Sequence, residues 1–126
     1  MQIRREAILI AFSRAETQNY IRSSLMSSGY AVHLALDGQQ IISQAETCVP
    51  DLILMDIVLP GIDALEVTRL IRVSNKKIRA IPIIINALFL ESFSARAQTV
   101  GCNELIRKPI DYELLKVTVK RYLPQN

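Results

Sequence analysis

Five short runs of apolar residues divide this chain of 126 residues, and a segment with helical spacing follows each run. The runs cover residues 7–12, 31–36, 52–55 and 81–85, with a weaker run at 104–106. Apolar runs of this length without polar alternation are typical of strands that are buried on both faces. Parallel strands need long crossover connections, which helices usually supply. The alternation therefore predicts an α/β fold in which five strand–helix units build one parallel sheet with helices on both faces.

The expected helices are recognised by apolar residues that recur three or four positions apart and so share one face. Gly29 and Gly101 follow two of these segments, where a left-handed residue often ends a helix. Asp63 and Asp111 precede two others, where a carboxylate accepts hydrogen bonds from the first backbone N–H groups. The apolar stripes consist of Ile21 and Leu25; Ile41, Ile42 and Ala45; Ala64, Val67, Leu70 and Ile71; Phe93, Ala97 and Val100; and Leu115, Val119 and Tyr122.

The composition excludes several classes of protein. Half of the residues are hydrophobic, which excludes disorder of the whole chain. The two cysteines lie far apart and His33 is the only histidine, so a structural zinc site is excluded. Neither a disulfide framework nor an apolar run of membrane-spanning length is present, and we expect a cytoplasmic protein that does not contact membranes.

The basic residues give little indication of a nucleic-acid partner. The chain has 15 basic and 12 acidic residues, and the resulting net charge of +3 is small. One basic group consists of Arg69 and Arg72 on an expected helix and of Lys76, Lys77 and Arg79 after it. Because no aromatic residues interleave with this group, we interpret it as a solvated surface.

Asp56 and Lys108 stand at the ends of two expected strands. Asp56 directly follows four apolar residues, and Lys108 follows the fifth run. Functional groups in parallel α/β sheets gather at the carboxyl ends of the strands, near the point where the strand order reverses. We therefore expect the two side chains to face each other across a crevice, with Lys108 neutralising charge on Asp56 or attached to it. Pro109 would fix the turn that directs Lys108.

The order of these features resembles a known family. An apolar strand, Asp56, a short loop with Pro60 and Gly61, and a helix follow one another, and Lys108 and Pro109 follow the last strand. This arrangement resembles the receiver domain of two-component response regulators, the CheY-like family, over essentially the whole chain. The resemblance implies a doubly wound (βα)5 fold with a five-stranded parallel sheet, the flavodoxin-like or CheY-like three-layer sandwich.

The resemblance also implies roles for particular residues. Asp56 takes the phosphoacceptor position and Lys108 the position of the cation that senses the phosphoryl group. The partner would be a histidine kinase or another signalling protein, with an output face on the last helices and the fifth strand. We expect residues 1–126 to form a single receiver-like domain without an effector domain. The domain would be no enzyme beyond self-phosphorylation of Asp56.

The sequence departs from the family at its metal site. In the family, the first strand ends in two acidic residues that hold Mg²⁺, but Phe12 and Ser13 occupy these positions here. Mg²⁺ prefers hard oxygen ligands and usually needs one or two carboxylates. Asp56 and the backbone carbonyl of Val58 would remain as ligands, so we expect no cofactor and at most weak Mg²⁺ binding.

A second departure affects the conformational switch of the family. The family places a Thr or Ser at the end of the fourth strand and an aromatic residue on the fifth. Counting along the chain puts either Ala87 or Asn86 at the first position, and neither carries a hydroxyl group. Leu105 stands at the second position. Both residues of the switch are therefore missing.

Two functions remain open on these observations. The first is an atypical response regulator of a bacterial two-component phosphorelay, in which Asp56 accepts a phosphoryl group. The second is a pseudo-receiver that binds protein partners independently of phosphorylation. In that case Asp56 and Lys108 would form an ion pair that is present without phosphorylation, with Arg14 as a candidate third member. The missing acidic pair favours the second function, whereas the retained Asp56 and Lys108 favour the first.

Overall fold

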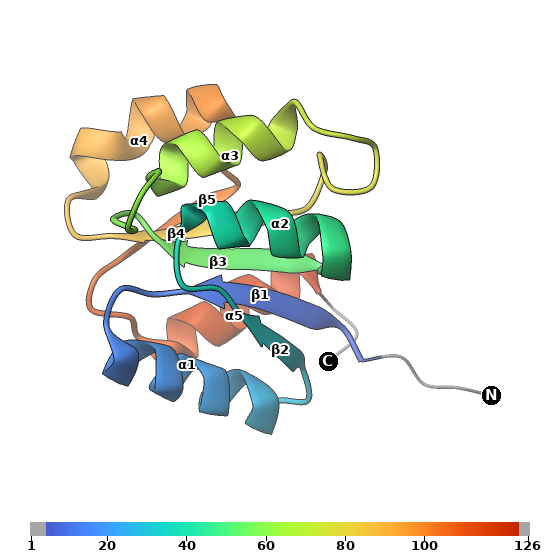
Figure 1. Cartoon of the computed structure of the whole chain (residues 1–126). Coiled ribbons are helices and arrows are strands. Elements are labelled where there is room, and N and C mark those ends of the chain that lie inside the picture. The colour runs from blue at the N-terminus through green and yellow to red at the C-terminus, as the bar shows by residue number, and fades with distance from the viewer. Residues whose placement is uncertain (1–4, 124–126) are drawn as a thin grey trace.

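The computed structural model describes residues 5–123, in which five parallel strands alternate with five helices (Figure 1). The predicted doubly wound five-stranded α/β fold is thereby confirmed. The elements in chain order are β1 (Ala7–Ala11), α1 (Ala15–Ser27), β2 (Ala31–Leu34), α2 (Gly38–Cys48), β3 (Leu52–Asp56), α3 (Ala64–Arg72), β4 (Ile83–Ala87), α4 (Leu90–Val100), β5 (Glu104–Arg107) and α5 (Tyr112–Tyr122).

The sheet has the strand order β2-β1-β3-β4-β5 and separates two layers of helices. Helices α1 and α5 cover one face, and α2, α3 and α4 cover the other (Figure 1). Alternate residues of the central strand serve the two cores, because successive side chains of a strand point to opposite faces. Leu52 and Leu54 pack on the α1 and α5 side, while Ile53 and Met55 pack on the opposite side. The strand order reverses between β1 and β3, so functional groups are expected beside the carboxyl ends of these two strands.

The predicted helix ends are confirmed. Gly29 and Gly101 have positive φ angles of 99° and 96° after α1 and α4. Asp63 accepts a hydrogen bond of 2.9 Å from the Glu66 backbone N–H, and Asp111 caps α5 in the same way. Among the described residues, no helix has the length and apolar content needed to cross a membrane.

The fourth strand lies further along the chain than its apolar run indicated. The run covers residues 81–85, but β4 is Ile83–Ala87. Asn86 interrupts the apolar pattern, yet its backbone continues both neighbouring ladders, opposite Asp56 on β3 and Ile106 on β5. Backbone pairing on two sides therefore extends the strand past the first polar residue.

Gly38→Ala is expected to destabilise the protein, because α2 begins very close to the loop before α3. A Cβ atom on Gly38 would overlap the Ile62 carbonyl oxygen and lie 2.9 Å from Val67 Cγ2. Overpacking of this kind costs about 1–3 kcal/mol in the free energy of unfolding, measured by urea denaturation. The matched control is Gln39→Ala, one residue along on the exposed side of α2, which should change stability by less than about 0.5 kcal/mol. Equal stability of the two variants would contradict this packing.

Candidate functional site

Asp56 is the last residue of β3 and lies at the point where the strand order reverses. The four residues before it are completely buried, since β3 is the central strand and both of its faces are covered. Asp56 itself is only 4% exposed, although it carries a carboxylate. A buried charge of this kind needs close partners, because its hydration has been removed.

Two side chains hold the Asp56 carboxylate. The Ser13 hydroxyl donates a hydrogen bond of 2.9 Å to Oδ2, and Lys108 Nζ lies 2.5 Å from Oδ1. Apart from this ion pair, Oδ1 has no hydrogen-bond partner among residues 5–123. Each carboxylate oxygen thus has one side-chain partner, and the negative charge is neutralised without any added group. We call these three residues the Asp56 cluster.

Lys108 reaches Asp56 from the far side of β4. Its backbone N–H donates a hydrogen bond of 3.0 Å to the Ala87 carbonyl, which extends the pairing of β4 and β5 by one residue. The Lys108–Pro109 peptide bond is cis. About a third of the Lys108 side chain, 31%, is exposed, so water reaches the cation while its partner stays buried.

A cleft of about 300 Å³ opens beside the Asp56 cluster. Asp56, Asn86 and Lys108 contribute polar groups to its wall, and Phe12 and Leu88 contribute apolar surface. Phe12 is almost fully buried and packs with the core under α1 and α5. Asp56 is the one acidic residue in the cleft wall, and within residues 5–123 no three His, Cys, Asp or Glu side chains form a group that could hold a metal.

Arg14 is not part of the Asp56 cluster, in contrast to its interpretation as a candidate third member. Its guanidinium lies 3.4 Å from the Glu16 carboxylate, and both side chains are largely exposed. Arg14 lines the cleft, but its ion pair is with Glu16, in the first turn of α1. A nearby exposed carboxylate at the helix start thus pairs with Arg14, and the charge of Asp56 is balanced by Lys108 instead.

The three residues at the predicted switch positions, Asn86, Ala87 and Leu105, carry no hydroxyl group, and each is buried or partly buried in the protein. Asn86 is 2% exposed, lines the cleft and donates a hydrogen bond of 2.9 Å to the Ile106 carbonyl. Ala87 is completely buried on the opposite side of the sheet, in the core under α2, α3 and α4. Leu105 is partly buried and packs against the same core.

The loop after β3 brings the remaining predicted residues to the surface beside the site. Val58 is 64% exposed and Pro60 is also exposed. Gly61 has a φ angle of 77°, and no atom lies within 4 Å of the place where a Cβ atom would be, so the backbone turn and not crowding favours glycine there. The direct bond from Ser13 to Asp56 was not predicted from the sequence, in which Ser13 was identified only as occupying the position of a metal-binding acidic residue. The sequence feature that could have indicated this bond is the position of Ser13 just after β1, the strand adjacent to β3.

The chain is similar to known proteins in both sequence and structure. Residues 8–120 match the response regulator receiver domain. The polar-differentiation response regulator DivK of Brucella ovis is 31% identical over 119 residues, which cover 94% of this chain and 96% of that protein. The receiver domain of the sensor histidine kinase PA1611 of Pseudomonas aeruginosa PAO1 has a TM-score of 0.86 and 30% identity, covering 97% of this chain and all of that one.

One structural relative bears on the site and another on the fold. The structure of the PA1611 receiver domain contains a magnesium ion coordinated in its active-site cleft. The chemotaxis response regulator CheY4 of Vibrio cholerae has a TM-score of 0.87 at 21% identity, covering 94% of this chain and 99% of that one. The similarity to CheY4 supports the five-stranded parallel α/β fold.

Proposed function

This chain belongs to the response regulator receiver domain family, and we propose that it is an atypical receiver in which the Asp56 cluster is already closed without phosphorylation. Receiver domains act in two-component signalling and interact with histidine kinases. The observation that carries the proposal is the pairing of both Asp56 carboxylate oxygens, with Ser13 and with Lys108. A carboxylate in this state has its charge balanced before any phosphoryl group arrives.

The donor groups of this site do not fit Mg²⁺ as a resident cofactor. Phe12 supplies a buried apolar ring and Ser13 a neutral hydroxyl at the end of β1, so Asp56 is the only carboxylate in the cleft. Mg²⁺ gives up its water ligands reluctantly and is usually held by one or two carboxylates in near-octahedral geometry. The single carboxylate here already has Lys108 as a cationic partner, which repels a second cation.

Slow phosphorylation of Asp56 follows from this arrangement. In phosphoryl transfer, catalysis depends on positioning and on cations that neutralise the charge of the transferred group. The metal contribution is worth several kcal/mol, and Lys108 alone has to replace it. Asp56 is still proposed as the phosphoacceptor position and Lys108 as its sensing cation. The domain acts on no separate substrate and signals by binding a protein partner.

A second candidate function is a pseudo-receiver whose partner binding is fully independent of phosphorylation. Asn86, Ala87 and Leu105 favour it, because they provide neither the hydroxyl nor the aromatic ring of a switch. In both candidates we propose that partners, a histidine kinase or another signalling protein, contact α4, β5 and α5. Exposed Leu114 and Val117 on α5 support such a contact, because each leaves more than half of its surface in solvent.

Titration with Mg²⁺, followed by the amide resonances of Ser13, Asp56 and Val58, tests the proposed site. We expect no saturable shifts at millimolar Mg²⁺, because one carboxylate with a lysine partner is a poor Mg²⁺ site. Ser13→Asp is the matched comparison, since it adds a second carboxylate at the end of β1 and should bind Mg²⁺ more tightly than the wild type. Saturable binding by the wild type at the Asp56 loop would contradict the proposed site.

A further inference from the structure

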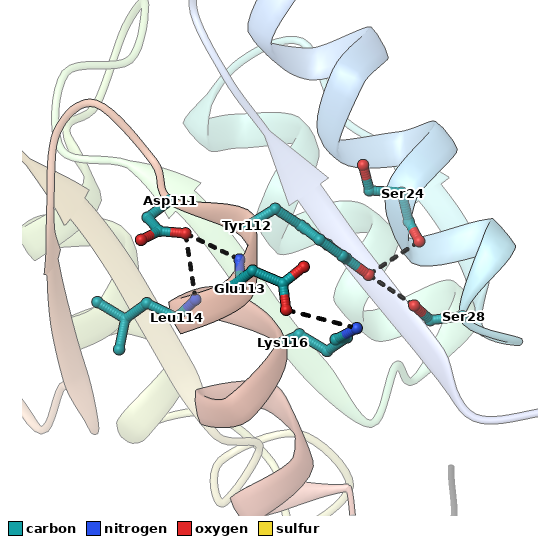
Figure 2. A network of polar contacts seen from close by, with 7 residues as sticks. All are labelled: Ser24, Ser28, Asp111, Tyr112, Glu113, Leu114 and Lys116. Atoms are coloured by element: carbon teal, nitrogen blue, oxygen red, sulfur yellow. Dashed lines mark hydrogen bonds and ion pairs between the residues drawn. The ribbon is translucent and has the colours of Figure 1, made fainter.

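Tyr112 joins the start of α5 to the last turns of α1. It is the first residue of α5, and its side chain extends across to Ser24 and Ser28 of the α1 segment (Figure 2). The phenol oxygen lies 2.9 Å from the Ser24 carbonyl and 2.7 Å from the Ser28 hydroxyl oxygen. A phenol has a single hydrogen to donate. Tyr112 therefore donates to Ser24, and the Ser28 hydroxyl donates to Tyr112.

The Tyr112 ring is also held in place. The Tyr20 ring of α1 meets it edge-on, with centroids 6.3 Å apart and an interplanar angle of 77°. Lys116, one turn further along α5, places its Nζ 5.9 Å from the centroid of the Tyr112 ring. Asp111, just before α5, accepts a hydrogen bond of 2.9 Å from the Glu113 N–H (Figure 2). The first turn of α5 is thus fixed by both its backbone and its first side chain.

The same turn anchors the segment that carries Lys108. Three residues, 109–111, separate Lys108 from Tyr112. On the strand side, the Lys108 N–H is fixed to the Ala87 carbonyl, so the first turn of α5 is the second anchor of this short connection. A lysine side chain loses considerable rotamer entropy when it is held in one geometry. The Lys108–Asp56 ion pair therefore depends on how firmly the backbone at Lys108 is held.

We propose that Tyr112 is a positioning residue that keeps Lys108 on Asp56. The tyrosine does not touch Asp56, and it acts by fixing the start of α5 against α1. This inference rests on the closed Asp56 cluster of the proposed function. It assigns a second role to the α1–α5 contact, which connects the state of the site to the packing of two helices.

Competitive acetylation of the lysine amines, with each lysine quantified by mass spectrometry, tests this proposal on the whole protein. Lys108 in its ion pair should react slowly, whereas Lys76 and Lys77 are exposed in a loop and serve as internal references. Tyr112→Phe keeps the ring and removes both hydrogen bonds. We expect it to raise the labelling of Lys108 relative to the references by about tenfold.

Tyr122→Phe is the matched control. The Tyr122 hydroxyl donates a hydrogen bond of 2.8 Å to Glu104, so this variant also removes a tyrosine hydroxyl bond from α5 but at the far end of the helix. We expect it to leave the relative labelling of Lys108 unchanged. Ser28→Ala removes one of the two bonds of Tyr112 and should give a smaller increase than Tyr112→Phe.

Asp56→Asn separates failure of this inference from failure of the proposed function. A rise in Lys108 labelling in Asp56→Asn shows that the ion pair exists in the wild type. If that rise is seen but Tyr112→Phe stays within twofold of the wild type, or if Tyr122→Phe rises as much, Tyr112 is not the positioning residue. If Asp56→Asn itself changes nothing, the ion pair is absent, and the proposed function fails together with this inference.

Discussion

Lys108→Met is expected to lower the free energy of unfolding by about 2–4 kcal/mol at neutral pH. The substitution keeps most of the length of the side chain but leaves the Asp56 carboxylate, which is 4% exposed, with the Ser13 hydroxyl as its only side-chain partner within residues 5–123. Removing one member of a buried ion pair is costly because the other charge stays buried without compensation. Partial exposure of Lys108 moves the expected loss toward the lower end of the usual range.

A double-mutant cycle by urea denaturation identifies this cause. Asp56→Asn removes the charge that Lys108→Met leaves uncompensated, so the double variant should recover most of the lost stability. Lys76→Met is the control, because Lys76 is exposed in a loop, where a substitution should change stability little. Simple additivity of the Lys108 and Asp56 substitutions would show that the two side chains do not interact as the structure describes.

Arg72→Ala is expected to lower the free energy of unfolding by about 2–4 kcal/mol, because its guanidinium donates hydrogen bonds to several backbone carbonyls, two of them partly buried. The guanidinium donates to the carbonyl oxygens of Gly101, Arg79 and Ile81 at 3.0, 3.1 and 2.8 Å, and to Asn103 Oδ1 at 2.8 Å. Burial lowers the pKa of Arg72 from its usual value, because the charged guanidinium loses part of its hydration. The substitution would remove this donor from the three carbonyls at the junction of α3, β4 and the segment before β5, while Asn103 Oδ1 would keep its hydrogen bond of 2.8 Å from the Ile83 N–H.

Arg69→Ala is the matched control for Arg72→Ala. It removes the same type of side chain from the same helix, but Arg69 forms an exposed ion pair with Glu66. Exposed pairs contribute little to stability, so urea denaturation should show a much smaller change for Arg69→Ala than for Arg72→Ala. Comparable losses in the two variants would contradict the structural role of Arg72.

The contacts of Arg72 were not predictable from the sequence. We interpreted it as part of a solvated basic group, because its charge and its place among other basic residues are visible in the sequence. Its backbone partners are carbonyls of two separate segments, the loop before β4 and the residue after α4. The sequence does not indicate which carbonyls face an arginine. Such contacts depend on how loops approach a helix end, which local sequence patterns do not specify.

The fold was predictable for a simple physical reason. Strands buried on both faces need continuous apolar residues, so runs such as that before Asp56 mark them directly. Asp63 and Asp111 marked helix starts because their carboxylates satisfy free N–H groups. The end of β4 was less predictable, since Asn86 continues the strand through backbone pairing that its polar side chain conceals.

The site was predictable only in part. Asp56 and Lys108 were identified from their places at strand ends, and the structure brings them together. The hydrogen bond from Ser13 depends on the register of β1 against β3, which the sequence does not specify. The contacts of Tyr112 depend on how α1 and α5 pack. Both were accessible only after the elements had been placed in space.

The most direct test of the closed, metal-poor Asp56 cluster is phosphorylation itself. Wild type and Asp56→Asn are incubated with a small-molecule phosphodonor, with and without Mg²⁺, and their intact masses are measured over time. We expect Mg²⁺ not to accelerate phosphorylation of the wild type, and any slow adduct to disappear in Asp56→Asn. A rapid, Mg²⁺-dependent phosphoryl adduct that is lost in Asp56→Asn would show a fully functional receiver and rule out the closed Asp56 cluster.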